Sequence, residues 1–102
     1  SPVATTLADG LACRTPEPEA LGIMLRSVDR IVEVSDDEVG ASIALLFQCT
    51  HNCAAGAGAA APAAIRKEKA RLTGRKVAAM LTGANIDREL FASVIARGAR
   101  PD

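Results

Sequence analysis

The sequence has few aromatic residues, and neither tryptophan nor tyrosine is among them. Phe47 and Phe91 are its two aromatic side chains, whereas alanine supplies much of the hydrophobic fraction of 49%. Because alanine buries little area per residue, such a core gains less from the hydrophobic effect than its composition suggests. A length of 102 residues suits one small domain, and we expect an isolated unit of this kind to be marginally stable.

A charge imbalance, a long apolar run and a cysteine framework are also missing. Twelve basic and twelve acidic side chains cancel, so we expect neither nucleic acid nor an anionic membrane as a partner. No apolar stretch approaches the length of about 20 residues that spans a bilayer, so no membrane is expected. Three cysteines form an odd number without framework spacing, which favours a reducing, cytoplasmic setting.

The first third of the chain predicts a loop, a helix and a strand. Residues 1–14 contain the turn signal Asp9-Gly10 and predict a loop that can include a short helix. After Pro18, apolar residues recur at the spacing of one helix face: Ala20, Leu21, Met24, Leu25 and Val28. Pro18 would lie near the first turn, where a missing N–H costs little. Residues 30–34 then predict a strand with two valines on one side.

Start and stop signals frame the middle helices. Ser35 and Glu38 form a Ser-x-x-Glu capping box, which predicts a helix that runs to about residue 50. Pro62 is awkward inside a helix, because it lacks an N–H and clashes with the preceding turn. A helix that continues over residues 63–70 therefore either starts close to Pro62 or is kinked there.

The last third predicts a strand followed by a helix. Residues 77–81 are a short, wholly apolar run, which suits a strand buried on both faces. A final amphipathic helix stops at Gly98 and carries the apolar set Leu90, Phe91, Val94 and Ile95. Helices that alternate with strands indicate an α/β fold.

Two segments imitate ligand-binding motifs but lack the context that these motifs need. Cys49, His51 and Cys53 are residue types that zinc prefers, but on a helix the histidine would point away from the two cysteines. We therefore expect no metal site and interpret the cysteines as buried structural thiols. Residues 55–61, Ala-Gly-Ala-Gly-Ala-Ala-Ala, imitate a dinucleotide fingerprint, but no strand immediately precedes them. Their glycines permit close backbone approach to a cofactor or to a neighbouring helix.

A hydroxyl and small residues follow the apolar run at residues 77–81. Thr82, Gly83, Ala84 and Asn85 occupy the expected carboxyl end of a strand, where ligands bind in open α/β sheets. A hydroxyl framed by residues too small to block a flat ring is a plausible cofactor contact. The alternative is a strand end with a turn and a helix cap that binds nothing.

Four blocks of the sequence resemble one enzyme family in the same order and spacing. Residues 81–87, Leu-Thr-Gly-Ala-Asn-Ile-Asp, resemble the Leu-Ser-Gly-Gly-Asn-Ile-Asp motif of the threonine/serine dehydratases, which are pyridoxal-phosphate enzymes of fold type II. Residues 4–12 are similar to the family's Thr-Ile-Ala-Asp-Gly segment. Residues 32–39 resemble its Val-Thr-Val-Ser-Glu-Asp-Glu-Ile, and residues 54–61 resemble its Val-Glu-Gly-Ala-Gly-Ala-Ala-Ala.

The resemblance implies a fold, a cofactor and a site. Residues 1–102 would be a C-terminal segment of the large domain that binds pyridoxal 5'-phosphate, with short parallel strands flanked by helices. The family's motif serine contacts the pyridine nitrogen, and Thr82 takes its place with the hydroxyl retained. The other implied cofactor contacts are Gly83, Ala84, Asn85, Gly56 and Gly58. The family's Schiff-base lysine lies upstream of the four blocks, so we expect no catalytic residue in this chain and no activity from it alone.

The resemblance also implies an activity and partners. The complete enzyme would be an ammonia-lyase that converts a β-hydroxy amino acid such as threonine or serine into a 2-oxo acid and ammonia. Its partners would be the small amino-acid substrate, the missing N-terminal part of the same enzyme, and further copies in a homo-oligomer. Three positions depart from the family: Ala55 replaces a glutamate, Pro62 a leucine and Ala84 a glycine. The alternative is a catalytically inactive dehydratase-like module that keeps the fold for binding or assembly.

Overall fold

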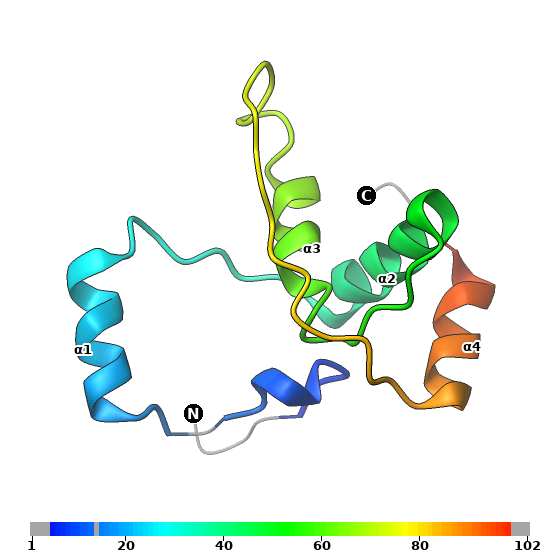
Figure 1. Cartoon of the computed structure of the whole chain (residues 1–102), viewed down its shortest axis with the longest axis horizontal. Coiled ribbons are helices and arrows are strands. Elements are labelled where there is room, and N and C mark those ends of the chain that lie inside the picture. Colours follow the sequence, from blue (N-terminus) through cyan, green and yellow to red (C-terminus); the bar gives the residue numbers. More distant parts are fainter. Residues whose placement is uncertain (1–4, 14, 99–102) are drawn as a thin grey trace.

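The computed structural model describes residues 5–13 and 15–98, and these residues form helices and loops. A short 3-10 helix, η1 (Asp9–Leu11), precedes the α-helices α1 (Pro18–Ser27), α2 (Asp36–Thr50), α3 (Ala60–Lys67) and α4 (Arg88–Arg97). Figure 1 shows α2, α3 and α4 grouped together, with α1 set apart at the end of a long connection. Within the described ranges, no helix is long and apolar enough to cross a bilayer.

The longest helix, α2, begins where the capping box predicts. Ser35 Oγ accepts a hydrogen bond from the Glu38 N–H at 3.1 Å, and Glu38 Oε1 accepts one from the Ser35 N–H at 2.7 Å. This reciprocal pair satisfies N–H groups that the start of a helix leaves free. At the other end, His51 adopts a left-handed conformation with a φ of 59°, and its N–H donates to the Phe47 carbonyl. The predicted extent to about residue 50 is confirmed.

The core lies where α2 packs against both α3 and α4. Its buried hydrophobic residues are Val39, Ile43, Ala44, Ala54, Ala59, Ala63 and Val94. Phe47 and Phe91 meet edge to face with their ring centroids 5.4 Å apart, which joins α2 to α4. More than half of these buried residues are alanines. The core therefore gains little hydrophobic free energy per residue, as the composition predicts.

The start of α3 settles the question that Pro62 raises. The helix begins at Ala60, so Pro62 is its third residue. The N–H groups of the first helical turn have no intrahelical partner, so the proline costs α3 no hydrogen bond. The first alternative, a helix that starts close to Pro62, is confirmed. The helix ends at Lys67, before the predicted residue 70, and turns continue as far as Gly74.

The predicted last helix is confirmed as α4. Its N-cap is Asp87, whose carboxylate accepts a hydrogen bond from the Leu90 N–H at 3.2 Å. Gly98 is its C-cap and has a φ of 77°, a conformation that favours glycine.

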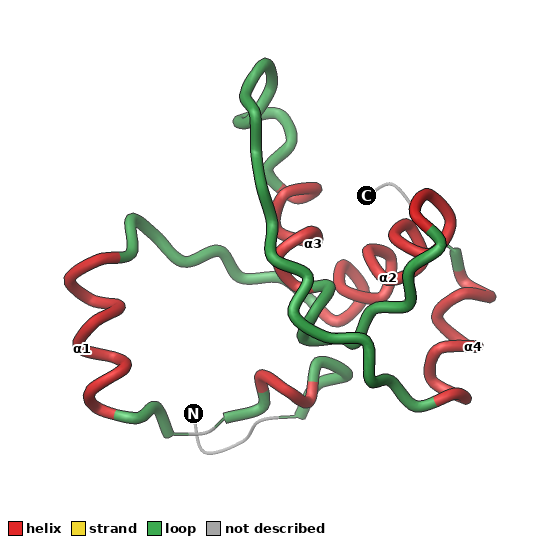
Figure 2. The backbone as a smooth tube through the Cα atoms, in the orientation of Figure 1, coloured by secondary structure: helices red, strands yellow, loops and turns green. Residues whose placement is uncertain are grey.

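Neither predicted strand forms a sheet in the part of the chain that the structure describes. Residues 30–34 and 77–81 run as irregular segments without a ladder of hydrogen bonds, and Figure 2 shows both as loop. A strand needs a neighbouring strand as the hydrogen-bond partner of its backbone groups. Among the described residues, neither segment has such a neighbour. The α/β layering is therefore not formed here. The prediction that residues 77–81 are buried is also wrong for this chain, since Val77 is 46% and Met80 77% exposed.

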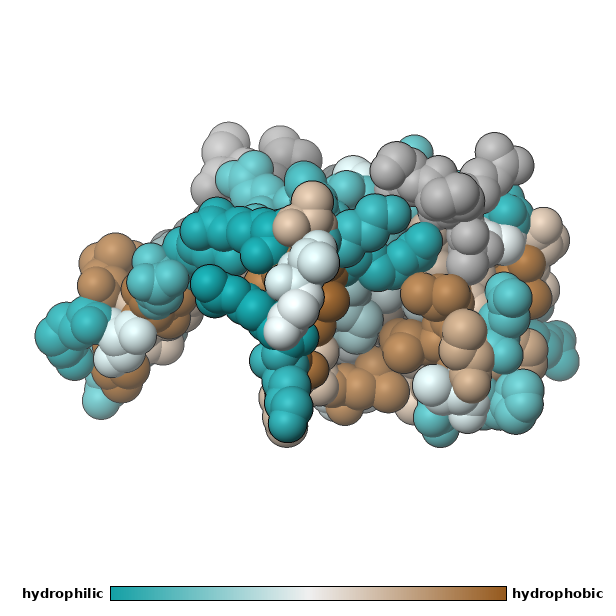
Figure 3. All heavy atoms as spheres, turned by 90° about the horizontal axis from the view of Figure 1, so that it is seen from above, coloured by the Kyte–Doolittle hydropathy of each residue, from teal (hydrophilic) through white to brown (hydrophobic). Residues whose placement is uncertain are grey.

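The predicted apolar face of α1 forms but is not covered. Glu17 caps the helix and Pro18 is its first residue, as the sequence predicts. Leu21, Met24 and Leu25 are nevertheless exposed, because α1 contacts no other helix among the described residues. Figure 3 shows its apolar side chains on a lobe that is separate from the main body.

Candidate functional site

Residues 54–59, which we call the hub, receive the backbone of two distant segments. Gly56 is buried, and a Cβ added to it would lie 2.6 Å from the Leu7 carbonyl oxygen. Gly58 is buried as well, and a Cβ there would lie 2.6 Å from the Gly83 carbonyl oxygen. These distances are too short for a carbon–oxygen contact, so both positions require glycine. The predicted close backbone approach is therefore present, and its partners are other parts of the chain.

A hydrogen bond joins the hub to residues 82–85, which we call the site segment. The Ala55 N–H donates to the Gly83 carbonyl oxygen at 2.9 Å. In Figure 1 the connection that leads to α4 crosses the connection that leads to α3 at this point. Gly83 is half-buried, whereas Thr82, Ala84 and Asn85 are exposed. The site segment is thus anchored through its glycine, while Thr82 and Asn85 remain exposed.

Asp36, in the first turn of α2, holds the first motif block beside the hub. Its carboxylate accepts hydrogen bonds from Thr6 Oγ1 and, at 3.2 Å, from the Leu7 N–H. Thr6 Oγ1 in turn accepts a hydrogen bond from the Ala8 N–H at 3.1 Å. Val39 of the second block also lies in one buried cluster with Ala54 and Ala59 of the hub. All four motif blocks therefore meet around the hub, although Ala4, the first residue of the first block, lies outside the described residues.

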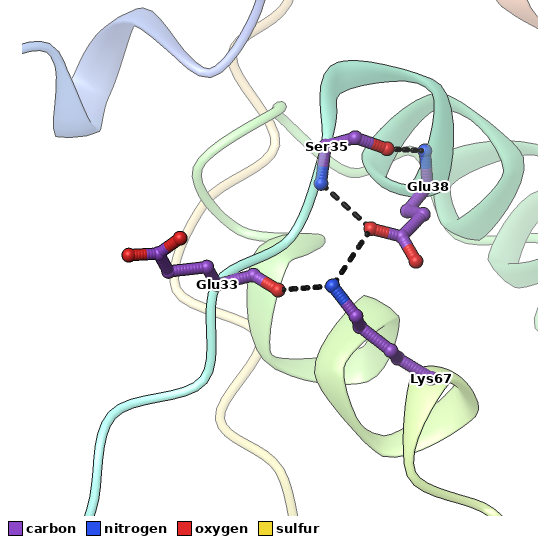
Figure 4. Close-up of polar contacts among 4 residues, drawn as sticks. All are labelled: Glu33, Ser35, Glu38 and Lys67. Carbon is purple, nitrogen blue, oxygen red and sulfur yellow. Dashed lines mark hydrogen bonds and ion pairs between the residues drawn. The ribbon is translucent and has the colours of Figure 1, made fainter.

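Lys67 connects α3 to the start of α2. Its Nζ lies 3.5 Å from Glu38 Oε1 and donates to the Glu33 carbonyl oxygen at 2.7 Å. Figure 4 shows the ammonium between these two oxygens. The hydrogen bond from the Ser35 N–H, helped by the charge of Lys67, holds the pKa of Glu38 below its ordinary value in spite of desolvation.

A second ion pair fastens the connection between α1 and α2 to the end of α3. Both terminal nitrogens of Arg30 donate to the carboxylate of Glu68. These hydrogen bonds raise the pKa of Arg30 and lower that of Glu68. Sequence reasoning missed these partners, because 38 residues separate Arg30 from Glu68.

Cys49 and Cys53 are not the buried thiols that the sequence predicts. Cys13 and Cys49 are exposed, and Cys53 is half-buried. Cys49 lies in the last turns of α2, beyond Ala44, where the buried part of that helix ends. Within the described ranges, no group of three or more His, Cys, Asp or Glu side chains is placed to hold a metal ion.

Known proteins match this chain over most of its length. Residues 1–83 match the family described as pyridoxal-phosphate dependent enzyme. The chain is 34% identical over 97 residues to an L-threonine ammonia-lyase of Geobacter sulfurreducens, a match that covers 95% of this chain and 24% of that enzyme. It is 34% identical over 93 residues to an L-threonine ammonia-lyase of Thermotoga maritima (91% of this chain, 23% of the enzyme). A phenylserine dehydratase of Ralstonia pickettii is 37% identical over 94 residues (91% and 29%).

These matches include the segments that meet at the hub. The stretch that matches the family contains Gly56, Gly58 and the pair Thr82-Gly83. The chain spans about a quarter of the length of the curated relatives it matches. On this basis the chain belongs to the family of pyridoxal-phosphate-dependent enzymes and is related to its threonine ammonia-lyases.

Proposed function

We propose that this chain is part of a pyridoxal-phosphate-dependent ammonia-lyase whose substrate is a β-hydroxy amino acid. The observation that carries the proposal is the meeting of the family's motif segments at one hub, which leaves the Thr82 hydroxyl accessible beside an anchored Gly83. The substrate class is supported by relatives that are named for threonine and phenylserine, since both amino acids carry a β-hydroxyl group.

The proposed reaction converts the amino acid into a 2-oxo acid and ammonia. One water leaves the substrate with its β-hydroxyl group, and one water is taken up when the amino group departs as ammonia, so the atoms balance. The bound cofactor supplies an electron sink for the electron pair that the departing Cα proton leaves behind.

The site segment fits one part of this cofactor, its pyridine nitrogen. A threonine hydroxyl forms a hydrogen bond with that nitrogen and stays neutral, so it does not favour a protonated ring as a carboxylate does. Thr82 is exposed, and the two residues after it are too small to cover a ring. Gly83, Ala84 and Asn85 belong to the proposed site because they are contiguous with Thr82.

We also propose that the other catalytic groups, including the lysine that binds the cofactor, lie outside this chain. No lysine here has the flanking residues of the family's cofactor lysine, and Lys67 is held by Glu38 and Glu33. We therefore propose that the chain alone is inactive. In the complete enzyme, which we propose to be a cytoplasmic homo-oligomer, residues 30–34 and 77–81 would be paired as short parallel strands. The helices that flank such a sheet would cover the exposed Val77 and Met80.

Replacement of Thr82 in the complete protein tests the proposal. The wild-type protein should bind pyridoxal phosphate and release a 2-oxo acid from threonine or serine. Thr82→Ala should keep the cofactor bound but lower kcat by at least about tenfold, whereas Thr82→Ser, which retains a hydroxyl, should keep most of the activity. Unchanged turnover in Thr82→Ala would remove Thr82 from the site. A wild-type protein that binds the cofactor but releases no 2-oxo acid would be the inactive binding module instead.

A further inference from the structure

Gly58 and Ala55 hold the same carbonyl group of the site segment. The Ala55 N–H donates to the Gly83 oxygen at 2.9 Å. The space beside Gly58 is filled by Gly83, whose oxygen and nitrogen would lie 2.6 and 3.0 Å from an added Cβ. Gly58 therefore allows the Gly83 carbonyl to come close enough to receive the Ala55 hydrogen bond.

A side chain at position 58 would move the residue next to Thr82. Ordinary van der Waals contact begins near 3.4 Å, so the Gly83 oxygen, now 2.6 Å from the Cβ position, would have to retreat. The obstacle is backbone, which has no alternative rotamer. Because Gly83 follows Thr82 directly and the peptide between them is planar, a displaced Gly83 carries the Thr82 backbone with it.

We propose that Gly58 is a positioning residue for Thr82, acting through the Ala55–Gly83 hydrogen bond to set where the Thr82 hydroxyl meets the pyridine nitrogen. This inference rests on the proposed function. It gives Gly58 a different role from the direct cofactor contact that the family resemblance implies. Gly56 takes no part in this anchor, because the backbone that fills its space belongs to Leu7 and Ala8.

A double-mutant cycle in the complete, cofactor-loaded protein tests the proposal. Gly58→Ala should lower kcat by about 10–100-fold and change the absorption band of the cofactor in the same direction as Thr82→Ala. In the double variant, the second substitution should add less than about threefold, because both changes remove the same contact. Gly40→Ala is the matched control, since a Cβ on this buried glycine would meet Val94 methyl groups at an ordinary 3.9 Å and should leave kcat and spectrum unchanged.

Two results would overturn the proposal: effects of Gly58→Ala and Thr82→Ala that multiply in the double variant, or wild-type kcat and spectrum in Gly58→Ala. If Gly58→Ala does not fold, hydrogen exchange in the wild-type protein tests whether the Ala55–Gly83 hydrogen bond is present. The Ala55 amide should exchange at least about 100-fold more slowly than an unprotected amide, and exchange at the unprotected rate would refute the anchor.

Failure of the proposed function would look different. A wild-type protein that takes up no pyridoxal phosphate would overturn the lyase proposal and the cofactor role of Thr82. Anchoring of Thr82 by Gly58 would still stand if the Ala55 amide were protected in the wild-type protein and lost that protection in Gly58→Ala.

Discussion

The ammonium group of Lys67 lies 3.5 Å from the Glu38 carboxylate while it donates a hydrogen bond to the Glu33 carbonyl. Glu38 also closes the capping box of α2 through Ser35. One side chain of α3 therefore supports both the start of α2 and the segment that leads into it. The contact couples two elements that flank the hub in sequence.

Loss of this bridge should destabilise the fold modestly. Lys67→Met keeps the length of the side chain but removes the hydrogen bond and the ion pair, so we expect the free energy of unfolding to fall by about 1 kcal/mol. Urea denaturation measures the change. Lys69→Met, at an exposed position two residues along the chain, is the matched control, and an equal loss in both variants would contradict the assigned role of Lys67.

Stability should fall at acid pH, in part through Glu38. The pKa of Glu38 is held below its ordinary value, first by the Ser35 N–H. A carboxylate with a lowered folded-state pKa contributes its full stabilisation above its unfolded pKa of about 4.3, and the contribution is lost as the pH falls through the lower folded value. Glu68, whose pKa Arg30 lowers, acts in the same direction.

Glu38→Gln should therefore reduce the dependence of unfolding free energy on pH between pH 6 and 3, about the range in which carboxylates titrate. Chemical denaturation at several pH values gives this dependence. Glu33→Gln is the control, because Figure 4 shows the Glu33 carboxylate directed away from Lys67. If the free energy of unfolding falls with decreasing pH as steeply in Glu38→Gln as in the wild type, the contribution of Glu38 is excluded.

Gly56→Ala should destabilise the fold independently of catalysis. The added Cβ would lie 2.6 Å from the Leu7 oxygen and 2.8 Å from Ala8 Cα, and Asp36 restrains this segment. We expect a loss of about 2–3 kcal/mol, measured as a shift in thermal unfolding. Gly22→Ala, whose Cβ would meet the mobile end of Arg26 at 3.5 Å, should instead be neutral or slightly stabilising. Wild-type stability in Gly56→Ala would contradict this prediction and show that the backbone of Leu7 and Ala8 can move to accommodate the added Cβ.

The edge-to-face pair of Phe47 and Phe91 should couple α2 to α4. Replacing both by leucine, singly and together, should give a coupling energy of about 0.5–1.5 kcal/mol, since the aromatic contact adds to simple burial. Denaturation of the four proteins of the cycle measures it. Additive single effects would mean that the rings contribute only the area they bury.

The predictions that succeeded depend on signals within a few residues of each other. Ser35 and Glu38 close their capping box across one helical turn, and Gly98 stops α4 in the same local way. The strand prediction for residues 77–81 depended instead on a neighbouring strand. An apolar run indicates only that a segment can form a strand, whereas a sheet also needs the backbone of a second segment beside it. Cys49 was misjudged because α2 extends past the core that buries its first half.

The close backbone approach at the hub glycines was predictable from the sequence, but the segments that they contact were not. The glycines at positions 56 and 58 indicated close backbone approach, but the pattern could not distinguish a cofactor from a chain segment as the neighbour. The contact of Gly58 with Gly83 joins residues 25 positions apart, and no local rule relates them. Separations of 30 and 29 residues likewise hid Asp36 as the partner of Thr6 and Leu7.

The contacts of Gly56 and Gly58 with Leu7 and Gly83 are made by main-chain atoms. A substitution at Leu7 or Gly83 therefore cannot remove the atoms that a side chain at position 56 or 58 would meet. In a library that randomises the hub, residues larger than alanine at Gly56 and Gly58 should be lost to misfolding, because even a Cβ at either position would lie 2.6 Å from a backbone oxygen. Thr82 and Ala84 are exposed, so libraries at these positions should retain folded proteins. Engineering of the proposed lyase would therefore leave Gly56 and Gly58 unaltered.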